Sequence, residues 1–237
     1  MEKISLIVIA EEEEIEINKQ QNLLLDSVFS INNIRLFLYK NLVSSKEFAL
    51  LFCGVGKSNS AFSLTNSIWA LKEKGYLINN IINIGPVGSI QDESIGNEFL
   101  IEKAYFYDVD LTYIPGYKLG QLPNNEYDFI TSASLNKKIS MLYPKKIQLK
   151  NICTADKFFF KQDIKKINNL FTNVSLVDME TASLVQIANK LNIEISIIKI
   201  VSDLLSHGEN YYISKKNIWK SKVNSVFKFL TEEFIKN

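Results

Sequence analysis

Short apolar runs recur along the chain, separated by segments whose apolar residues follow a helical spacing. The runs of strand length are Ile4 to Ala10, Ile34 to Tyr39, Phe48 to Cys53, Ile78 to Ile84, Phe99 to Tyr107, Ile147 to Cys153, Val174 to Val177 and Ile195 to Val201. Several consist almost wholly of Ile, Leu and Val, which is typical of strands that are covered on both faces. The pattern therefore predicts a buried β-sheet.

The segments between these runs predict helices. Helical spacing is found in the stretches Lys57 to Lys74, Lys161 to Phe171, Met179 to Leu191 and Ser214 to Ile235. In the last stretch the apolar residues form one stripe, with lysines opposite: Ile218, Trp219, Val223, Val226, Phe227, Leu230 and Phe234. We expect this helix to close the fold by packing on the sheet, the alternative being an anionic membrane surface.

Strands that alternate with helices predict an α/β fold. We expect one domain over residues 1–237, with a mixed, mainly parallel β-sheet flanked by helices. Ligands in such folds bind at the carboxyl ends of the strands, so residues that follow the predicted strands are the candidates for a functional site.

Composition narrows the class of protein. The chain has 237 residues, of which 46% are hydrophobic and 22% charged, and 27 Lys and Arg against 26 Asp and Glu give a net charge of +1. These values exclude a disordered chain and a strongly basic nucleic-acid binder. No apolar run approaches the roughly 20 residues of a membrane helix, so we expect no membrane partner. The apolar run Ile4 to Ala10 is followed at once by four glutamates and has no small-residue cleavage site, so we expect it to be a strand and not a signal peptide.

The cysteines and the histidine argue against disulfide and metal chemistry. Two cysteines, Cys53 and Cys153, are too few for a disulfide scaffold and favour a reducing, cytoplasmic location. One histidine, His207, is too few for a histidine metal site. We therefore expect no metal and no cofactor.

Two glycine-rich segments follow strands. The segment Gly54 to Ser58 ends in Gly-Lys-Ser, but Leu51 stands where a phosphate-binding loop needs its first glycine, so that motif is excluded. A second segment, Gly85 to Ser89, follows the strand at Ile78 to Ile84. Two such turns after neighbouring strands indicate a shared crevice for a small ligand, or simply two tight turns.

Carboxylates also gather where predicted strands end. Glu11 to Glu14 follow the first strand, Asp178 and Glu180 follow another, and Asp203 follows Ser202 at the end of a third. Each alone is explained by helix capping or by the helix dipole. Together they are what cleavage of a glycosidic bond requires: an acid for the leaving group and a base for water.

Seven segments in order carry a family resemblance from Lys3 almost to the C-terminus. They are AEEEE, CGVGKSNSA, NIGPVGS, YDVDLT with GYKLGQLP, TADKFF, VDMETA and VSD. The chain resembles the nucleoside phosphorylase superfamily and, within it, the bacterial methylthioadenosine/S-adenosylhomocysteine nucleosidases. The resemblance implies hydrolysis of the N-glycosidic bond of these adenine nucleosides, which releases adenine and the thioribose in methionine salvage.

The resemblance also implies roles for residues that contact the sugar and the bond that breaks. Glu13 matches the glutamate that activates water, although the run of four glutamates permits a shift of one residue. Asp203 matches the acid that protonates purine N7, with Ser202 holding its side chain. Glu180 matches the carboxylate that binds the ribose hydroxyls, and Met179 packs against the sugar.

Further matches concern the base and the 5′ end of the substrate. Phe158 matches the ring that stacks on adenine, and Phe159 the residue whose backbone reads the purine edge. Residues 111–123 resemble a loop that crosses a homodimer interface and completes the neighbour's site, with Tyr117 and Pro123 as the clearest matches.

Three other functions stay open at this point. A phosphorylase of the same fold needs arginines to bind phosphate, and the sequence contains only Arg35, so hydrolysis is favoured. An aminofutalosine hydrolase would act on the same adenine and ribose. A non-catalytic nucleoside-binding or surface interaction protein is suggested by Pro86, which replaces the serine usual in the family and removes a backbone donor.

Overall fold

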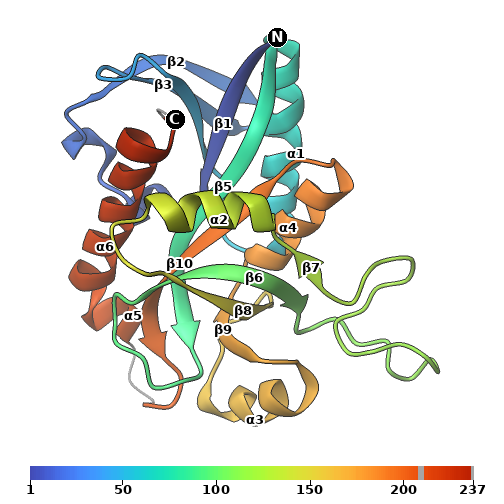
Figure 1. Cartoon of the computed structure of the whole chain (residues 1–237). Helices are drawn as coiled ribbons and strands as arrows, with labels where there is room; N and C mark the ends of the chain where they lie inside the picture. Colours follow the sequence, from blue (N-terminus) through green and yellow to red (C-terminus); the bar gives the residue numbers. More distant parts are fainter. Residues whose placement is uncertain (208–210, 236–237) are drawn as a thin grey trace.

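The computed structural model describes residues 1–207 and 211–235 and has a mixed sheet at its centre (Figure 1). The strands are β1 (Glu2–Ile9), β2 (Leu23–Ile31), β3 (Ile34–Asn41), β4 (Glu47–Phe52), β5 (Tyr76–Ser89), β6 (Glu98–Phe106), β7 (Phe129–Ile130), β8 (Gln148–Thr154), β9 (Val174–Asp178) and β10 (Ile195–Leu204). The helices are α1 (Lys57–Glu73), α2 (Ala133–Leu142), α3 (Lys161–Leu170), α4 (Thr181–Lys190), α5 (Tyr211–Ser214) and α6 (Lys216–Phe229). Short helical segments are η1 (Glu12–Glu14), η2 (Ile17–Lys19) and η3 (Leu230–Phe234).

Parallel strands form the middle of the sheet. β1 lies between β4 and β5, and β5 also pairs with β10, all in parallel. Antiparallel β2 and β3 extend the β4 side, and β6 pairs antiparallel with β10. β8 and β9 continue in parallel from β6, and β9 then meets the end of β5 at Gly88 and Ser89, so five strands form a closed ring. The expected mixed α/β fold is confirmed.

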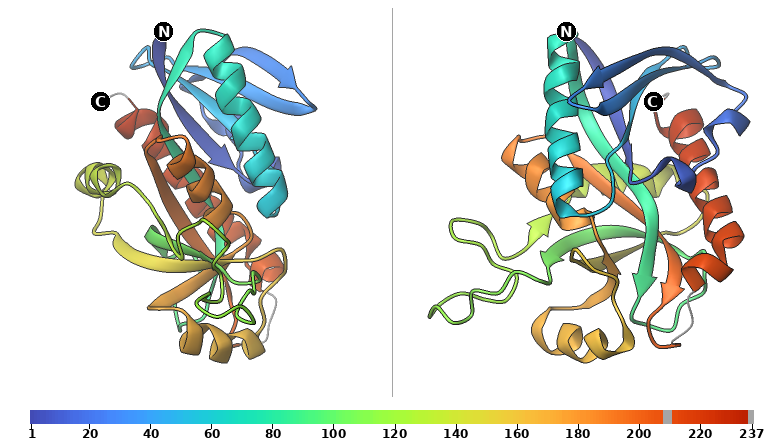
Figure 2. Two further views of the ribbon diagram at one scale, coloured as in Figure 1. Left: turned by 90° about the vertical axis from the view of Figure 1, so that its right-hand side faces the viewer. Right: turned by 180° about the vertical axis from the view of Figure 1, so that it is seen from behind.

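Helices cover both faces of the central strands (Figure 2). α1 and α4 bury their apolar side chains against one face, where Val8, Ile197 and Val201 lie. α6 covers the opposite face, where Trp219 and Phe227 pack with the next residues along the same strands. The expectation that the C-terminal helix closes the fold is confirmed. Ile218, which the sequence pattern placed on the apolar stripe of this helix, is nevertheless exposed.

Two features differ from the expectations. The segment Gly85 to Ser89 is not a turn: it continues β5, and Lys199 to Leu204 of β10 pair with it. The sequence pattern also missed β2, β7 and α2. β2 carries polar residues such as Asp26 among its apolar ones, β7 has two residues, and α2 buries just two apolar side chains, Leu135 and Ile139. In the part of the chain described here, no helix combines the length and apolar character needed to cross a membrane.

Candidate active site

A cavity of about 340 Å³ opens where β1, β5, β9 and β10 end. Its wall comes from segments far apart in the sequence, which the topology brings to one edge of the sheet. The lining residues used below are Glu11, Glu14, Asn83, Gly85, Pro86, Lys157, Phe158, Phe159, Asp178, Met179, Glu180, Lys199, Ser202, Asp203 and Tyr212. This position agrees with the expected place for a ligand in such a fold.

Of the four glutamates after β1, Glu11 and Glu14 line the cavity, and only Glu14, one residue after the one expected, is buried. Glu13 is 80% exposed, pairs with Lys216 at 2.9 Å and does not line the cavity. Glu14 is 4% exposed and lines it. The turn η1 causes this difference, because successive residues of a 3₁₀ turn point in different directions. The expected register at this position is therefore wrong by one residue.

Burial raises the pKa of Glu14 to about 8, while the Lys199 ammonium opposes that rise. Oε2 of this carboxyl has no hydrogen-bond partner within residues 1–207 and 211–235. A buried carboxyl with a raised pKa and a free oxygen on a cavity can take up a proton near neutral pH. Glu14 thus has the properties of a general base that acts on a bound molecule.

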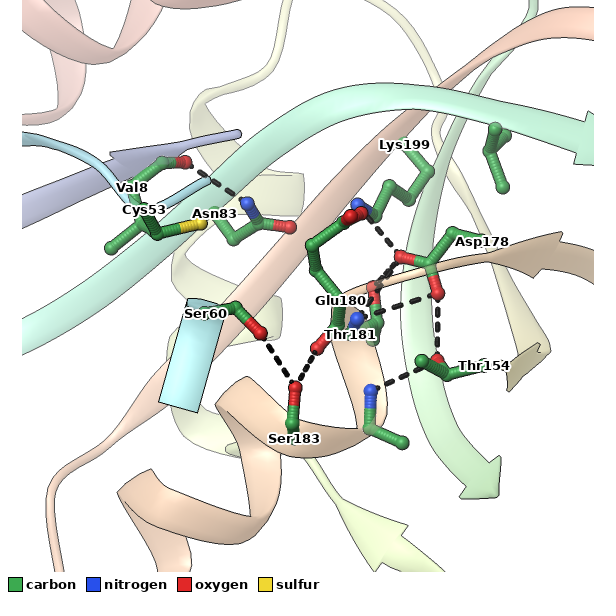
Figure 3. A network of polar contacts seen from close by, with 12 residues as sticks. Val8, Cys53, Ser60, Asn83, Thr154, Asp178, Glu180, Thr181, Ser183 and Lys199 are labelled. Carbon is green, nitrogen blue, oxygen red and sulfur yellow. Dashed lines mark hydrogen bonds and ion pairs between the residues drawn. The ribbon is translucent and has the colours of Figure 1, made fainter. Parts of the chain in front are cut away.

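A buried ion pair lies beside Glu14 and is shown in Figure 3. Lys199 Nζ lies 3.0 Å from Asp178 Oδ2, and both side chains are 2% exposed. Thr154 Oγ1 donates to Asp178 Oδ1 at 2.6 Å, and the backbone N–H and hydroxyl of Thr181 also donate to this carboxylate. Burial alone lowers the pKa of Lys199, but the surrounding carboxylates, above all Asp178, raise it overall. The cavity therefore has a fixed ammonium group in its wall.

Glu180 stands at the start of α4 and lines the cavity, as expected. The backbone N–H of Gly56 donates to its Oε1 at 2.8 Å. Gly56 has φ +95, and a Cβ there would lie 3.0 Å from Asp156 Oδ1, so the backbone conformation and the nearby carboxylate both favour glycine at the position whose N–H binds Glu180. Burial, followed by the charge of Asp178, raises the pKa of Glu180. Met179, the residue before it, also lines the cavity.

Asp203 and Ser202 both reach the cavity from the end of β10, but Ser202 does not hold the aspartate. Asp203 Oδ1 accepts from the backbone N–H of Tyr211 at 3.0 Å. Ser202 Oγ donates instead to the carbonyl of Val87 at 3.2 Å, because Ser202 is the extra residue where the register of β10 against β5 shifts between Val201 and Asp203. Burial raises the pKa of Asp203, opposed by backbone N–H groups that include that of Tyr211. A raised pKa suits a group that delivers a proton.

Aromatic side chains line the cavity opposite the strand ends. Phe158 and Phe159 both contribute, as expected; the first is largely exposed and the second is buried. Tyr212, which the sequence did not single out, meets Phe158 edge to face at 6.3 Å between ring centroids. It also stacks on Trp219 at 5.1 Å. The arrangement offers ring faces to a flat, partly apolar ligand.

Tyr117 and Pro123 do not line the cavity of their own chain. They belong to the segment between β6 and β7 that extends away from the body of the protein (Figure 1). Tyr113, near the middle of this segment, is 99% exposed. Within one chain, the loop at 111–123 is therefore separate from the other candidate residues.

Pro86 lies inside β5, where it lines the cavity and pairs with Ile200 of β10. Proline cannot donate a backbone hydrogen bond. A strand therefore accommodates proline only where its backbone nitrogen does not have to pair with a neighbouring strand. The extended strand continues to Ser89, so Pro86 leaves the wall of the cavity intact.

Sequence reasoning missed three residues of this site: Lys199, Asn83 and Tyr212. Lys199 and Asn83 are polar residues within apolar strands, and this signal could have found them. A buried polar group costs free energy unless it has a partner or a function. Tyr212 carries no such signal, because its position follows from the path of the chain after β10.

The site contains acids, a base and one buried cation, which suits proton transfer around a polar ligand. Among the residues that the structure describes, no group of three or more His, Cys, Asp or Glu side chains is arranged to hold a metal ion. His207 is exposed, lies 3.4 Å from Asp92 and does not line the cavity.

The raised pKa of Glu14 predicts a pH-dependent effect of Glu14→Gln on stability. In the folded protein the carboxyl group of Glu14 stays protonated up to about pH 8, whereas in the unfolded chain it loses its proton near pH 4.5. The free energy of unfolding of the wild type therefore falls as pH rises through this window, by up to about 1.4 kcal/mol per pH unit. Glutamine does not titrate, so its stability relative to the wild type should increase between pH 5 and pH 8.5. Urea unfolding of both proteins at these pH values measures the difference, and a constant difference contradicts the burial of an acidic proton at Glu14.

Comparison with known proteins extends these observations. The sequence profile of the phosphorylase superfamily matches residues 6–235. A 5′-methylthioadenosine/S-adenosylhomocysteine nucleosidase from Buchnera aphidicola is 32% identical over 218 residues, which cover 90% of this chain and 88% of that protein.

Solved structures agree with this relationship. A Borrelia burgdorferi protein assigned to the same nucleosidases, bound to adenine, has a TM-score of 0.79 and 30% identity, covering 96% of this chain and 98% of the other. Futalosine hydrolase of Helicobacter pylori has a TM-score of 0.82, with 97% and 95% covered, but its 22% identity supports the fold alone. The chain therefore belongs to the phosphorylase superfamily, within the family of the 5′-methylthioadenosine/S-adenosylhomocysteine nucleosidases.

Proposed function

We propose that the protein hydrolyses the N-glycosidic bond of 5′-methylthioadenosine and S-adenosylhomocysteine, releasing adenine and the thioribose. One observation carries this proposal: Glu14 and Asp203, two carboxyl groups of raised pKa, line the same cavity. Hydrolysis of a glycosidic bond needs one group to accept a proton from water and another to protonate the leaving base.

In this mechanism Glu14 replaces Glu13 as the group that activates water. Water attacks the anomeric carbon while its proton passes to Glu14, and Asp203 gives a proton to N7 of the departing purine. The sugar gains positive charge in the transition state, and this charge and the Lys199 ammonium both favour the ionised form of Glu14. Glu180 binds the ribose hydroxyls and Met179 packs against the sugar.

The aromatic residues hold the base in this proposal. Phe158 stacks on adenine, and the backbone of Phe159 reads the purine edge. Ser202 acts indirectly: its hydrogen bond to Val87 fixes the end of β10 against β5, which places Asp203. The mechanism uses no metal and no cofactor.

Water is favoured over phosphate as the nucleophile. Among the described lining residues the cations are Lys157 and Lys199, and each pairs with an aspartate: Lys157 with Asp163 at 2.9 Å, Lys199 with Asp178 at 3.0 Å. Arg35 pairs with Glu12 outside the cavity. A bound phosphate dianion needs several charge-assisted hydrogen bonds and uncompensated positive charge, and here each lysine charge is already balanced by an aspartate.

A direct assay with three substrates tests the proposal. Purified protein is incubated separately with methylthioadenosine, S-adenosylhomocysteine and aminofutalosine, and adenine is measured by chromatography. We expect adenine from the first two. Adenine from aminofutalosine alone would mean that the protein is an aminofutalosine hydrolase. No adenine from any of the three substrates would favour a non-catalytic binding role.

We also propose that the protein is a cytoplasmic homodimer in which residues 111–123 complete the neighbour's site. The exposed position of Tyr113, and of Ile114 beside it, supports a partner for this loop, and the free, buried Cys53 and Cys153 support a reducing compartment. We expect light scattering to give about twice the chain mass of 27.1 kDa. Replacing Tyr117 with Ala should raise KM for methylthioadenosine more than it lowers kcat. A mass of one chain would contradict the shared site.

A further inference from the structure

Asn83 presents an unpartnered oxygen to the cavity. It lies on β5, is 2% exposed and lines the cavity wall. Its Nδ2 donates to the carbonyl of Val8 at 3.0 Å, which fixes the orientation of the amide, since only the NH₂ group can donate. Its Oδ1 accepts no hydrogen bond in the described part of the chain. Strand pairing thus holds an acceptor in a place where it needs a donor from outside the protein.

Oε2 of Glu14, the oxygen without a partner, lies near Gly85, which is on the same face of β5 as Asn83. Residues two apart on a strand share a face and are about 6.6 Å apart, which places Gly85 next to Asn83 on this face. A Cβ at Gly85 would lie 3.4 Å from Glu14 Oε2 and 3.7 Å from Lys199 Nζ. The glycine therefore leaves open the space into which Asn83, Glu14 and Lys199 are directed.

With Glu14 in its ionised form, as the proposed mechanism requires, two buried acceptors and one donor surround a common space and match the hydrogen-bonding capacity of a single water molecule. Water has two hydrogens to donate and accepts through its lone pairs, and a buried acceptor left without a hydrogen bond destabilises the protein. Lys199 uses one hydrogen bond on Asp178 and keeps further donors. No single alcohol group of a substrate satisfies both acceptors, because it has only one hydrogen.

We propose that Asn83 binds the nucleophilic water, so that one hydrogen points to Asn83 Oδ1 and the other to Glu14 Oε2. This inference rests on the proposed hydrolysis. Lys199 donates to the water oxygen, and the remaining lone pair faces the anomeric carbon. The new C–O bond forms as the C–N bond breaks, the hydrogen on Glu14 is transferred, and the hydrogen on Asn83 stays on the new hydroxyl.

Methanol distinguishes this role from a structural one. It has one O–H hydrogen, so with that hydrogen on Glu14 its methyl group must face the oxygen of Asn83. The wild type, assayed with methylthioadenosine in buffered methanol, should therefore form free methylthioribose and very little of the methyl glycoside. This measurement uses the unmodified protein. A wild-type product ratio that simply follows the molar ratio of methanol to water would overturn the inference.

Asn83→Ala removes the acceptor and makes room for the methyl group. We expect the ratio of methyl glycoside to free sugar to rise at least about tenfold, and kcat for hydrolysis to fall about 10- to 100-fold, with a smaller change in KM. Asn80→Ala is the matched control, because Asn80 lies on the same strand, is buried and has an unpartnered Oδ1 in the described chain, but does not line the cavity. It should keep the wild-type ratio.

The outcomes separate the two proposals. If the wild type releases adenine but Asn83→Ala leaves the product ratio unchanged, the assignment of Asn83 is wrong and hydrolysis stands. A rise in KM alone would place Asn83 against a sugar hydroxyl, which also overturns the assignment. If the wild type releases no adenine, both proposals fail.

Discussion

Glu14→Gln should lower kcat for methylthioadenosine hydrolysis by about 10²- to 10⁴-fold, the usual contribution of a general base. Glutamine fills nearly the same volume as glutamate but cannot accept the proton of the attacking water. KM should change little, because the lost interaction acts in the transition state and not in substrate binding. Initial rates at several substrate concentrations, measured as released adenine, give both constants.

Glu13→Gln is the matched control, since it makes the same chemical change one residue earlier. Glu13 is exposed and pairs with Lys216 on the surface, an interaction of small energy. We expect its kcat to stay within about twofold of the wild type. The reverse result, an inactive Glu13 variant and an active Glu14 variant, would restore the register expected from the sequence.

Asp203→Asn should reduce kcat to a similar extent, by about 10²- to 10⁴-fold. Asparagine keeps the size of the side chain and its acceptor for the Tyr211 N–H, but it has no acidic proton for the leaving purine. The loss should be much smaller for a nitrophenyl glycoside of the same thioribose, because nitrophenolate leaves without protonation. Parallel assays with both substrates measure this contrast.

Asp92→Asn provides the control for that substitution. Its side chain is 89% exposed and lies near His207, away from the cavity. Its rates should match those of the wild type with both substrates. An equal loss with both substrates in Asp203→Asn would mean that Asp203 supports the structure of the site and does not protonate the leaving group.

The sequence predicted the fold and most of the cavity wall. Runs of Ile, Leu and Val marked the buried strands, and the acidic residues at strand ends indicated where a ligand binds. Glu180, Met179, Phe158 and Asp203 all line the cavity, because each follows a strand or loop whose position is fixed by the sheet. The local pattern indicated Glu180 and Asp203, whereas Met179 and Phe158 were indicated by the family resemblance.

Other features depend on geometry that a linear pattern does not contain. A four-residue run of glutamates has no internal signal of direction, so only the turn η1 shows that Glu14 points inward. The hydroxyl of Ser202 faces Val87 because β10 continues through Asp203 and pairs with β5. Asn83, Lys199 and Glu14 line one cavity only after three strands are assembled, which no spacing along the chain predicts.

The most direct test of whether this cavity is a hydrolase site is to identify the sugar product formed from methylthioadenosine. The product is measured by mass spectrometry after reaction in buffers with and without phosphate. We expect free methylthioribose and adenine in both buffers, at rates that do not depend on phosphate. A sugar 1-phosphate that forms only when phosphate is present would contradict hydrolysis and would mean that the cations paired with Asp163 and Asp178 become available to the anion.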